Sequence, residues 1–192
     1  MALALAAGSA GVGLVAGSSH AALREALDWQ RALLASEPWR WWSAACVHLD
    51  TMHLAANLAG CAAVAAFGMA GGLGWRAALA WFLAWPLTHL LLTLAPGVER
   101  YAGSSGVLHA GVATAAVFII AQSGQEGVRR WMGAAVALGL LVKLAVEQPW
   151  MGPVQRVAGW DFPVVVAAHA AGALAGTLCA LAVLWWSRSL RD

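Results

Sequence analysis

Six long apolar runs, separated by short polar stretches, dominate the pattern of this chain. They cover approximately residues 2–22, 49–69, 75–94, 105–122, 131–146 and 163–186. Each run is long enough, or nearly so, for the roughly 20 residues that a helix needs to cross a bilayer. Because lipid cannot satisfy open backbone groups, each crossing run is expected to be helical. The pattern therefore predicts one all-α integral membrane domain over residues 1–192 with six transmembrane helices.

Composition agrees with this class of protein. Hydrophobic residues make up 61% of the 192 residues, charged residues 10%, and the mean hydropathy is +0.72. A soluble domain has about 25% charged residues and could not bury so much apolar surface. The twelve tryptophans fit a membrane protein, whose indoles gather near the interfaces. A net charge of +2 with scattered basic residues gives no indication of nucleic acid binding.

The longest polar interval, residues 23–48, is expected to be a loop at the membrane interface. Leucines at positions 23, 27, 33 and 34 have the spacing of an amphipathic segment, with charged residues between them. The first 20 residues lack the basic start of a signal peptide, since the first charged residue is Arg24, and we interpret them as the first span. Five arginines on each side leave the orientation undecided.

A serine lies between glycines where the fourth run begins, in the stretch Gly103-Ser104-Ser105-Gly106. Ser105 falls where a loop becomes a helix, so unpaired backbone N–H groups are expected beside it. Such donors can hold an oxyanion. The alternative is a seam of small residues, Gly106 and Ala110, for helix packing.

His169 begins the sixth run and is followed by Gly172 and Gly176 on the same helical face. This glycine stripe allows a close approach between two helices. A serine–histidine hydrogen bond between helices needs such an approach. The alternative is a structural histidine whose ring is bonded to a backbone carbonyl.

Three further polar residues lie near the start of the second run. His53 and Asn57 are four residues apart on one helical face, and His48 precedes them at the helix entrance. An inward-facing imidazole and carboxamide could complete an oxyanion hole, although hydrogen bonding between helices is the simpler interpretation of this pair alone. His109, four residues after Ser105, is a rival base with poorer alignment, and we favour His169.

Together these residues predict a serine hydrolase whose site lies within the membrane, with a Ser105–His169 dyad. No metal ion or cofactor is expected. The three cysteines have no metal-binding spacing and are expected to be buried hydrophobic residues.

Four short motifs follow one another in the order and spacing of a known membrane family: Glu37 and Arg40 within "EPWRWW", His48-x4-His53-x3-Asn57, Gly103-x-Ser105-Gly106, and His169-x2-Gly172-x3-Gly176. In these motifs the chain resembles the rhomboid intramembrane serine proteases. It is most similar to the rhombosortase branch, which is linked to GlyGly-CTERM sorting tails. That similarity rests on "YAGSSGVLHAG", "KLAVEQ", "VVVAAHAAGALAG" and the six-span length. Ser104 and Ala110 depart from the usual residues of that branch, and Ser104 adds a second hydroxyl beside Ser105.

The resemblance implies a six-helix rhomboid fold with a partly embedded first loop and peptide-bond hydrolysis by Ser105 and His169. Asn57, His53 and the Ser105 N–H would hold the oxyanion. His48 would support the site, and Glu37 and Arg40 would anchor the first loop. Gly103, Gly106, Gly172 and Gly176 are the glycines of its motifs. Near the end of the fifth span, Lys143 and Glu147 are expected to pair, or Glu147 to contact a substrate tail.

The implied substrates are secreted proteins with a C-terminal transmembrane tail, cleaved near glycine residues. The implied location is the bacterial inner membrane, with several spans and a site open to the periplasmic or extracellular side. Two alternatives stay open: a general rhomboid protease of single-span proteins, and a catalytically silent rhomboid-like protein that binds membrane clients. A channel or transporter would favour paired carboxylates or an inverted repeat, and neither is present.

Overall fold

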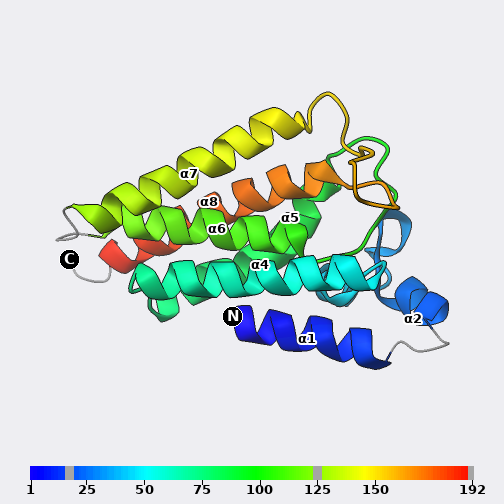
Figure 1. Ribbon diagram of the computed structural model, residues 1–192. Helices are drawn as coiled ribbons and strands as arrows, with labels where there is room; N and C mark the ends of the chain where they lie inside the picture. The colour runs from blue at the N-terminus through cyan, green and yellow to red at the C-terminus, as the bar shows by residue number, and fades with distance from the viewer. Residues whose placement is uncertain (16–19, 123–126, 190–192) are drawn as a thin grey trace.

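The computed structural model describes residues 1–15, 20–122 and 127–189. Eight α-helices are assigned among them, so the chain is all-helical apart from one pair of two-residue strands. The long helices are α1 (Ala2–Val15), α4 (Thr51–Ala70), α5 (Trp75–Leu92), α6 (Ser105–Ala121), α7 (Val128–Glu147) and α8 (Val166–Ser189), and they lie roughly side by side (Figure 1). The predicted helices after the first loop are therefore present, with ends within about three residues of the apolar runs.

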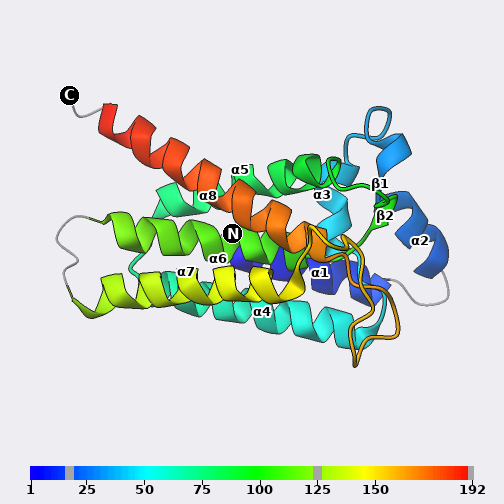
Figure 2. The same cartoon turned by 90° about the horizontal axis from the view of Figure 1, so that it is seen from above.

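Helix α6 occupies the middle of the bundle. It contacts α4, α5, α7 and α8, and most of its side chains are buried. Figures 1 and 2 both show it enclosed by these neighbours. A helix that is apolar on every side is stable only when it is surrounded in this way. Ser105, at its first position, is consequently held at one end of the bundle interior.

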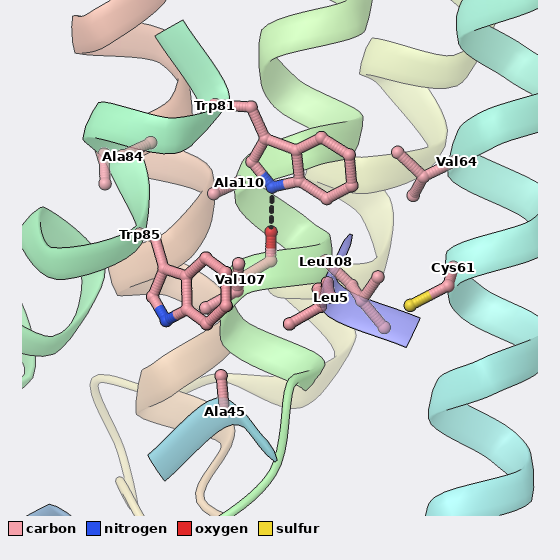
Figure 3. Close-up of a cluster of buried hydrophobic side chains, with 11 residues drawn as sticks. Leu5, Ala45, Cys61, Val64, Trp81, Ala84, Trp85, Val107, Leu108 and Ala110 are labelled. Atoms are coloured by element: carbon pink, nitrogen blue, oxygen red, sulfur yellow. Dashed lines mark hydrogen bonds between the residues drawn. The ribbon is translucent and has the colours of Figure 1, made fainter. Parts of the chain in front are cut away.

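A cluster of buried side chains joins α6 to α1, α4 and α5. It includes Leu5, Cys61, Val64, Trp81, Val107 and Leu108 (Figure 3). The indole N–H of Trp81 donates a hydrogen bond of 2.7 Å to the carbonyl oxygen of Val107. Gly111 lies against the same indole, where a Cβ would come within 2.6 Å of the ring. This packing fixes α5 against α6.

The structure describes the first apolar run only in part. We expected a span over residues 2–22; α1 covers Ala2–Val15, and residues 16–19 lie outside the described part. A second helix, α2 (His20–Leu27), follows. The 14 residues of α1 extend for about 21 Å, less than the hydrocarbon thickness of a bilayer.

The interval 23–48 is more structured than one amphipathic segment. After α2 it contains strand β1 (Trp29–Gln30), a 3-10 turn (Arg31–Leu33), helix α3 (Arg40–Ser43) and a second 3-10 turn (Ala44–Cys46). Strand β1 pairs antiparallel with β2 (Arg100–Tyr101), immediately before the Ser105 motif. The first loop is thereby attached to the segment that carries the serine.

Within residues 1–15, 20–122 and 127–189, two helices, α4 and α8, are long and apolar enough to cross a membrane, judged by length and composition. Helix α6 and the first part of α1 are apolar but shorter. Large apolar side chains are exposed on the outer faces of several helices, among them Phe82, Leu138, Leu141, Leu174 and Leu181. In water an apolar surface of this extent would be unusual for a monomer.

Candidate active site

Ser105 and His169 lie side by side at one end of the bundle. Ser105 is the first residue of α6, and His169 lies in the first turn of α8. Nε2 of His169 is 3.1 Å from Oγ of Ser105. The close packing of α6 and α8 depends on Gly172 and Gly176, because a Cβ at either position would overlap the backbone of α6. The glycine stripe therefore has the predicted effect, and the two side chains are within the range of a nucleophile and its base.

Glu147 completes a chain of three polar side chains, which the sequence did not predict. Its carboxylate oxygens lie 2.9 and 3.0 Å from Nδ1 of His169. Because an ionised carboxylate can only accept, Nδ1 carries the hydrogen, and Nε2 is left as the acceptor that faces Ser105. The expected pair with Lys143 is present as well, with 2.6 Å from Nζ to Oε1. Glu147 therefore serves both partners at once.

His109 contacts the same site but has a different bonding pattern. Its ring is stacked on that of His169, with 4.1 Å between centroids and 11° between planes. Its Nδ1 lies 2.7 Å from the backbone carbonyl oxygen of Ser105, to which it donates. This geometry favours His169 over His109 as the base for Ser105 and gives His109 the role of a packing partner.

Two side chains of α4, His53 and Asn57, face the segment before Ser105. Nδ1 of His53 accepts the Leu49 N–H at 3.2 Å, so its hydrogen is on Nε2. One amide hydrogen of Asn57 is donated to the His53 carbonyl oxygen, at 2.9 Å, and the second is available. Both residues line the same cavity as Ser105 and His169. Three N–H donors are thus available near Ser105, including its own N–H at the helix start.

Gly103 allows this approach. Its φ of +115° lies in a region that residues with side chains rarely adopt. A Cβ at this position would also lie 2.6 Å from Nε2 of His53. Gly106 is restricted similarly, since its Cβ would meet the Ala168 carbonyl oxygen at 2.9 Å. The motif glycines are therefore explained by close contacts with α4 and α8.

Tyr101, the only tyrosine of the chain, is a further neighbour that sequence reasoning missed. Its hydroxyl accepts the Gly106 N–H at 3.0 Å and lies 3.4 Å from Oγ of Ser105. Burial raises the pKa of Tyr101 above its ordinary value, so the hydroxyl remains protonated. The one signal in the sequence was its place at the start of "YAGSSGVLHAG", four residues before Ser105.

His48 and Ser104 lie beside the site without joining it. The ring of His48 packs edge-on against His53, with 4.9 Å between centroids. Burial lowers the pKa of His48 to about 4, so it is neutral at physiological pH. Ser104 is fully buried, and its Oγ has no partner among the described residues. Ser105 lines the cavity and Ser104 does not, which supports Ser105 as the reactive hydroxyl.

Arg40 and Glu37 hold the first loop together, as predicted. The guanidinium of Arg40 is buried and lies 2.6 Å from the Glu37 carboxylate. It also contacts Asp28, whose side-chain oxygen is at 3.2 Å and whose carbonyl oxygen is at 2.7 Å. Asp28 was not anticipated as a partner. Through these contacts the guanidinium of Arg40 connects α3 to Asp28, the residue between α2 and β1.

An elongated cavity of about 790 Å³ leads away from these residues. Its polar end contains His53, Asn57, Ser105, His109, Glu147 and His169, and Lys143 also lines it. The rest is lined by apolar and small residues of α4, α6 and α7, as far as Phe67 and Val136. Trp160 and Phe162, from the connection between α7 and α8, cover the polar end and contact the ring of His53. The cavity therefore extends from the Ser105–His169 pair into an apolar region between the helices.

In the described part of the chain, one group of side chains is close enough to share a metal ion: His109, Glu147 and His169, with ligand atoms within 4.8 Å of one another. Both ring nitrogens of His169 and Nδ1 of His109 already take part in hydrogen bonds. A metal ion on His169 would replace its bond to Ser105 or to Glu147. The geometry therefore fits acid–base chemistry without a metal ion.

Comparison of the sequence with protein-family models and with curated proteins gives no match. The resemblance to rhomboid proteases therefore rests on the sequence motifs alone.

Proposed function

We propose that this chain is an intramembrane serine protease of the rhomboid type. The observation that carries the proposal is the hydrogen-bonded series Ser105–His169–Glu147 at the end of an apolar cavity. A nucleophile, a base and a residue that orients the base are the parts that peptide-bond hydrolysis requires. The sequence analysis proposed a dyad, and Glu147 extends it to a triad.

The membrane arrangement belongs to the same proposal. Helices α4 to α8 cross the bilayer, and the first apolar run, whose helix α1 packs against α4, is the first of six spans. Exposed leucine, phenylalanine and valine side chains on the outer faces of α5, α7 and α8 support this arrangement, because lipid rather than water would cover them. The Ser105 end carries the polar loops and would face the periplasmic or extracellular side of the bacterial inner membrane.

In the first step, Oγ of Ser105 attacks the scissile carbonyl carbon and forms a C–O bond, while its proton passes to Nε2 of His169. The Glu147 carboxylate stabilises the imidazolium through Nδ1–H. The carbonyl oxygen becomes an oxyanion, held by N–H donors of Ser105, His53 and Asn57. Each donor of this kind is worth about 2.7–4 kcal/mol of the barrier.

The intermediate then collapses and the C–N bond breaks. Nε2 of His169 gives its proton to the leaving amine, and the acyl group remains on Ser105. In the second half of the reaction water attacks the acyl carbon and gives its proton to His169. The ester C–O bond to Ser105 then breaks, the new carboxyl end leaves, and His169 returns the proton to Oγ of Ser105. The hydroxyl of Tyr101, beside Oγ of Ser105, can donate a hydrogen bond to the serine oxygen when it is regenerated.

The proposed substrates are secreted proteins with a C-terminal tail of glycine motif, apolar helix and basic end. The tail helix would lie against the apolar part of the cavity, and its glycine segment would reach Ser105. Glycine destabilises a helix by about 1 kcal/mol per residue, which helps a segment to unwind into the site. No metal ion, cofactor or nucleic acid takes part.

Cleavage in reconstituted liposomes tests this function. One substrate carries a Gly-Gly/apolar/basic tail, and a second is an ordinary single-span protein without the glycine motif. We expect the first to be cleaved near its glycines by the parent and by Ser104→Ala, and not by Ser105→Ala. Cleavage of the second substrate alone would support a general rhomboid protease. Cleavage of neither, by a folded parent, would support the catalytically silent client-binding alternative.

A further inference from the structure

A second cavity, of about 760 Å³, lies at the opposite end of the bundle from Ser105. It is bounded by the start of α5, the end of α6 and the end of α8. Figure 2 shows the end of α8 diverging from α6 in this region. Two arginines line the cavity, Arg76 and Arg188, together with Trp75, Gln122 and Ser187. None of its lining residues is acidic.

The side chain of Arg76 has a buried hydrogen-bond donor, Nε, that lacks an acceptor among the described residues. Its guanidinium lies 5.5 Å from the ring of Trp75, an exposed indole at the start of α5. A buried N–H of a charged group without an acceptor is costly, and an anionic oxygen supplies the acceptor. The guanidinium geometry suits the oxygens of a phosphate group in particular.

The distribution of charged residues along the bundle also favours an anion at this end. The helices alternate in direction, so the starts of α5 and α7 and the ends of α4, α6 and α8 share this end. Arg76, Arg129, Arg130 and Arg188 all belong to it. Every acidic residue of the described ranges lies at the Ser105 end, whereas Glu126 and Asp192 fall outside those ranges. An anion is therefore favoured here by the surrounding field as well as by direct contact.

We propose that this cavity binds the phosphate headgroup of an anionic phospholipid, with Arg76 and Arg188 on the phosphate and Trp75 at the level of the headgroups. Basic pockets between transmembrane helices are suited to such headgroups, and tryptophan favours the membrane interface. The inference rests on the proposed membrane arrangement but not on proteolysis. Free phosphate offers the same oxygens, so the test separates the two sources.

The test is native mass spectrometry of the full chain in detergent, with phosphatidylglycerol or phosphatidylcholine added at equal concentration. We expect phosphatidylglycerol to be retained at least tenfold more than phosphatidylcholine, and Arg76→Gln and Arg188→Gln each to remove most of the excess. Arg130→Gln is the matched control, because this arginine is exposed at the same end but does not line the cavity. It should leave the excess unchanged.

Equal retention of the two lipids would overturn the proposal. An excess lost in Arg130→Gln but not in Arg76→Gln would do the same, since the lipid would then bind elsewhere. Competition by millimolar inorganic phosphate would assign the site to a soluble anion instead of a lipid. The membrane arrangement has its own readout: a chain that stayed monodisperse without detergent would contradict that arrangement, whatever the lipid result. None of these measurements depends on peptide cleavage.

Discussion

Glu147 ends α7 with its carboxylate 2.9 Å from Nδ1 of His169, a residue of α8. Lys143 contacts the same carboxylate from one turn earlier, at 2.6 Å, and is about half exposed. The two contacts of the Glu147 carboxylate have different roles. Lys143 holds the position of the carboxylate, and the carboxylate holds the orientation of the ring. The orientation of the His169 ring is therefore fixed by a residue of another helix.

Replacing Glu147 should impair the chemical step. In Glu147→Gln the neutral amide no longer stabilises the imidazolium, and it can favour the wrong tautomer of His169. We expect kcat to fall by about 10²- to 10⁴-fold with little change in KM, because the contact matters most in the transition state. Steady-state cleavage in liposomes measures both constants. In the matched variant Lys143→Gln, kcat should fall far less. An unchanged kcat in Glu147→Gln would return the site to a simple dyad.

Removal of the Tyr101 hydroxyl tests the residue that the motifs did not include. Tyr101→Phe keeps the ring but leaves the buried Gly106 N–H without its acceptor, which costs about 1–3 kcal/mol. It also removes the hydrogen-bonding partner of the serine oxygen. We expect cleavage to slow by roughly tenfold, a barrier change near 1.4 kcal/mol, with a modest loss of thermal stability. Parent-like values for both quantities would show that the hydroxyl is dispensable.

The glycine stripe of α8 predicts a specific pattern of stability. Gly172→Ala and Gly176→Ala each place a methyl group against the backbone of α6, and the helices must separate. We expect each to lower the free energy of unfolding by about 1–3 kcal/mol, and Gly172→Ala to reduce cleavage as well. Gly68→Ala is the control, because nothing lies within 4 Å of a Cβ at that position. Thermal unfolding in detergent measures the difference, and equal effects of Gly68→Ala and Gly172→Ala would argue against tight packing.

The first loop should depend on the charge of Arg40. Arg40→Gln leaves Asp28 and Glu37 without their buried partner, and such a loss costs about 3–5 kcal/mol. The exposed ion pair of Glu99 with Arg31, at 3.6 Å, provides the comparison, since Glu99→Gln should have little effect. Proteolytic susceptibility of the 23–48 loop, with thermal unfolding alongside, measures both. Equal proteolytic susceptibility and equal thermal stability of the two variants would contradict the anchoring role of Arg40.

The sequence analysis was most successful where one force dominates. Lipid-compatible helices need long apolar runs, so the helices from α4 onwards were predicted with nearly correct ends. The glycine stripe beside His169 predicted a close approach to another helix, and the glycines of α8 do lie against α6. The first span, expected over residues 2–22, stays a prediction, because residues 16–19 lie outside the described part.

The contacts that the sequence did not predict join residues that are distant along the chain. Lys143 and Glu147 satisfy one another on a single helix, so nothing in their spacing indicated a third partner on α8. Strand β1 has two residues, too few for an alternating pattern, and its partner Tyr101 is remote along the chain. Only the folded loop brings Tyr101 beside Ser105. Asp28 was missed in the same way, because its partner Arg40 already had a nearby acid in Glu37.

The most direct test of the central claim is covalent labelling with a fluorophosphonate, followed by peptide mass spectrometry. The reagent reports an activated serine without any assumption about the substrate. We predict a phosphonyl adduct on Ser105 in the parent and in Ser104→Ala, strongly slowed labelling in His169→Ala, and none in Ser105→Ala. His109→Ala should still be labelled. An adduct on Ser104, or no adduct on a folded parent, would contradict the proposal that His169 activates Ser105.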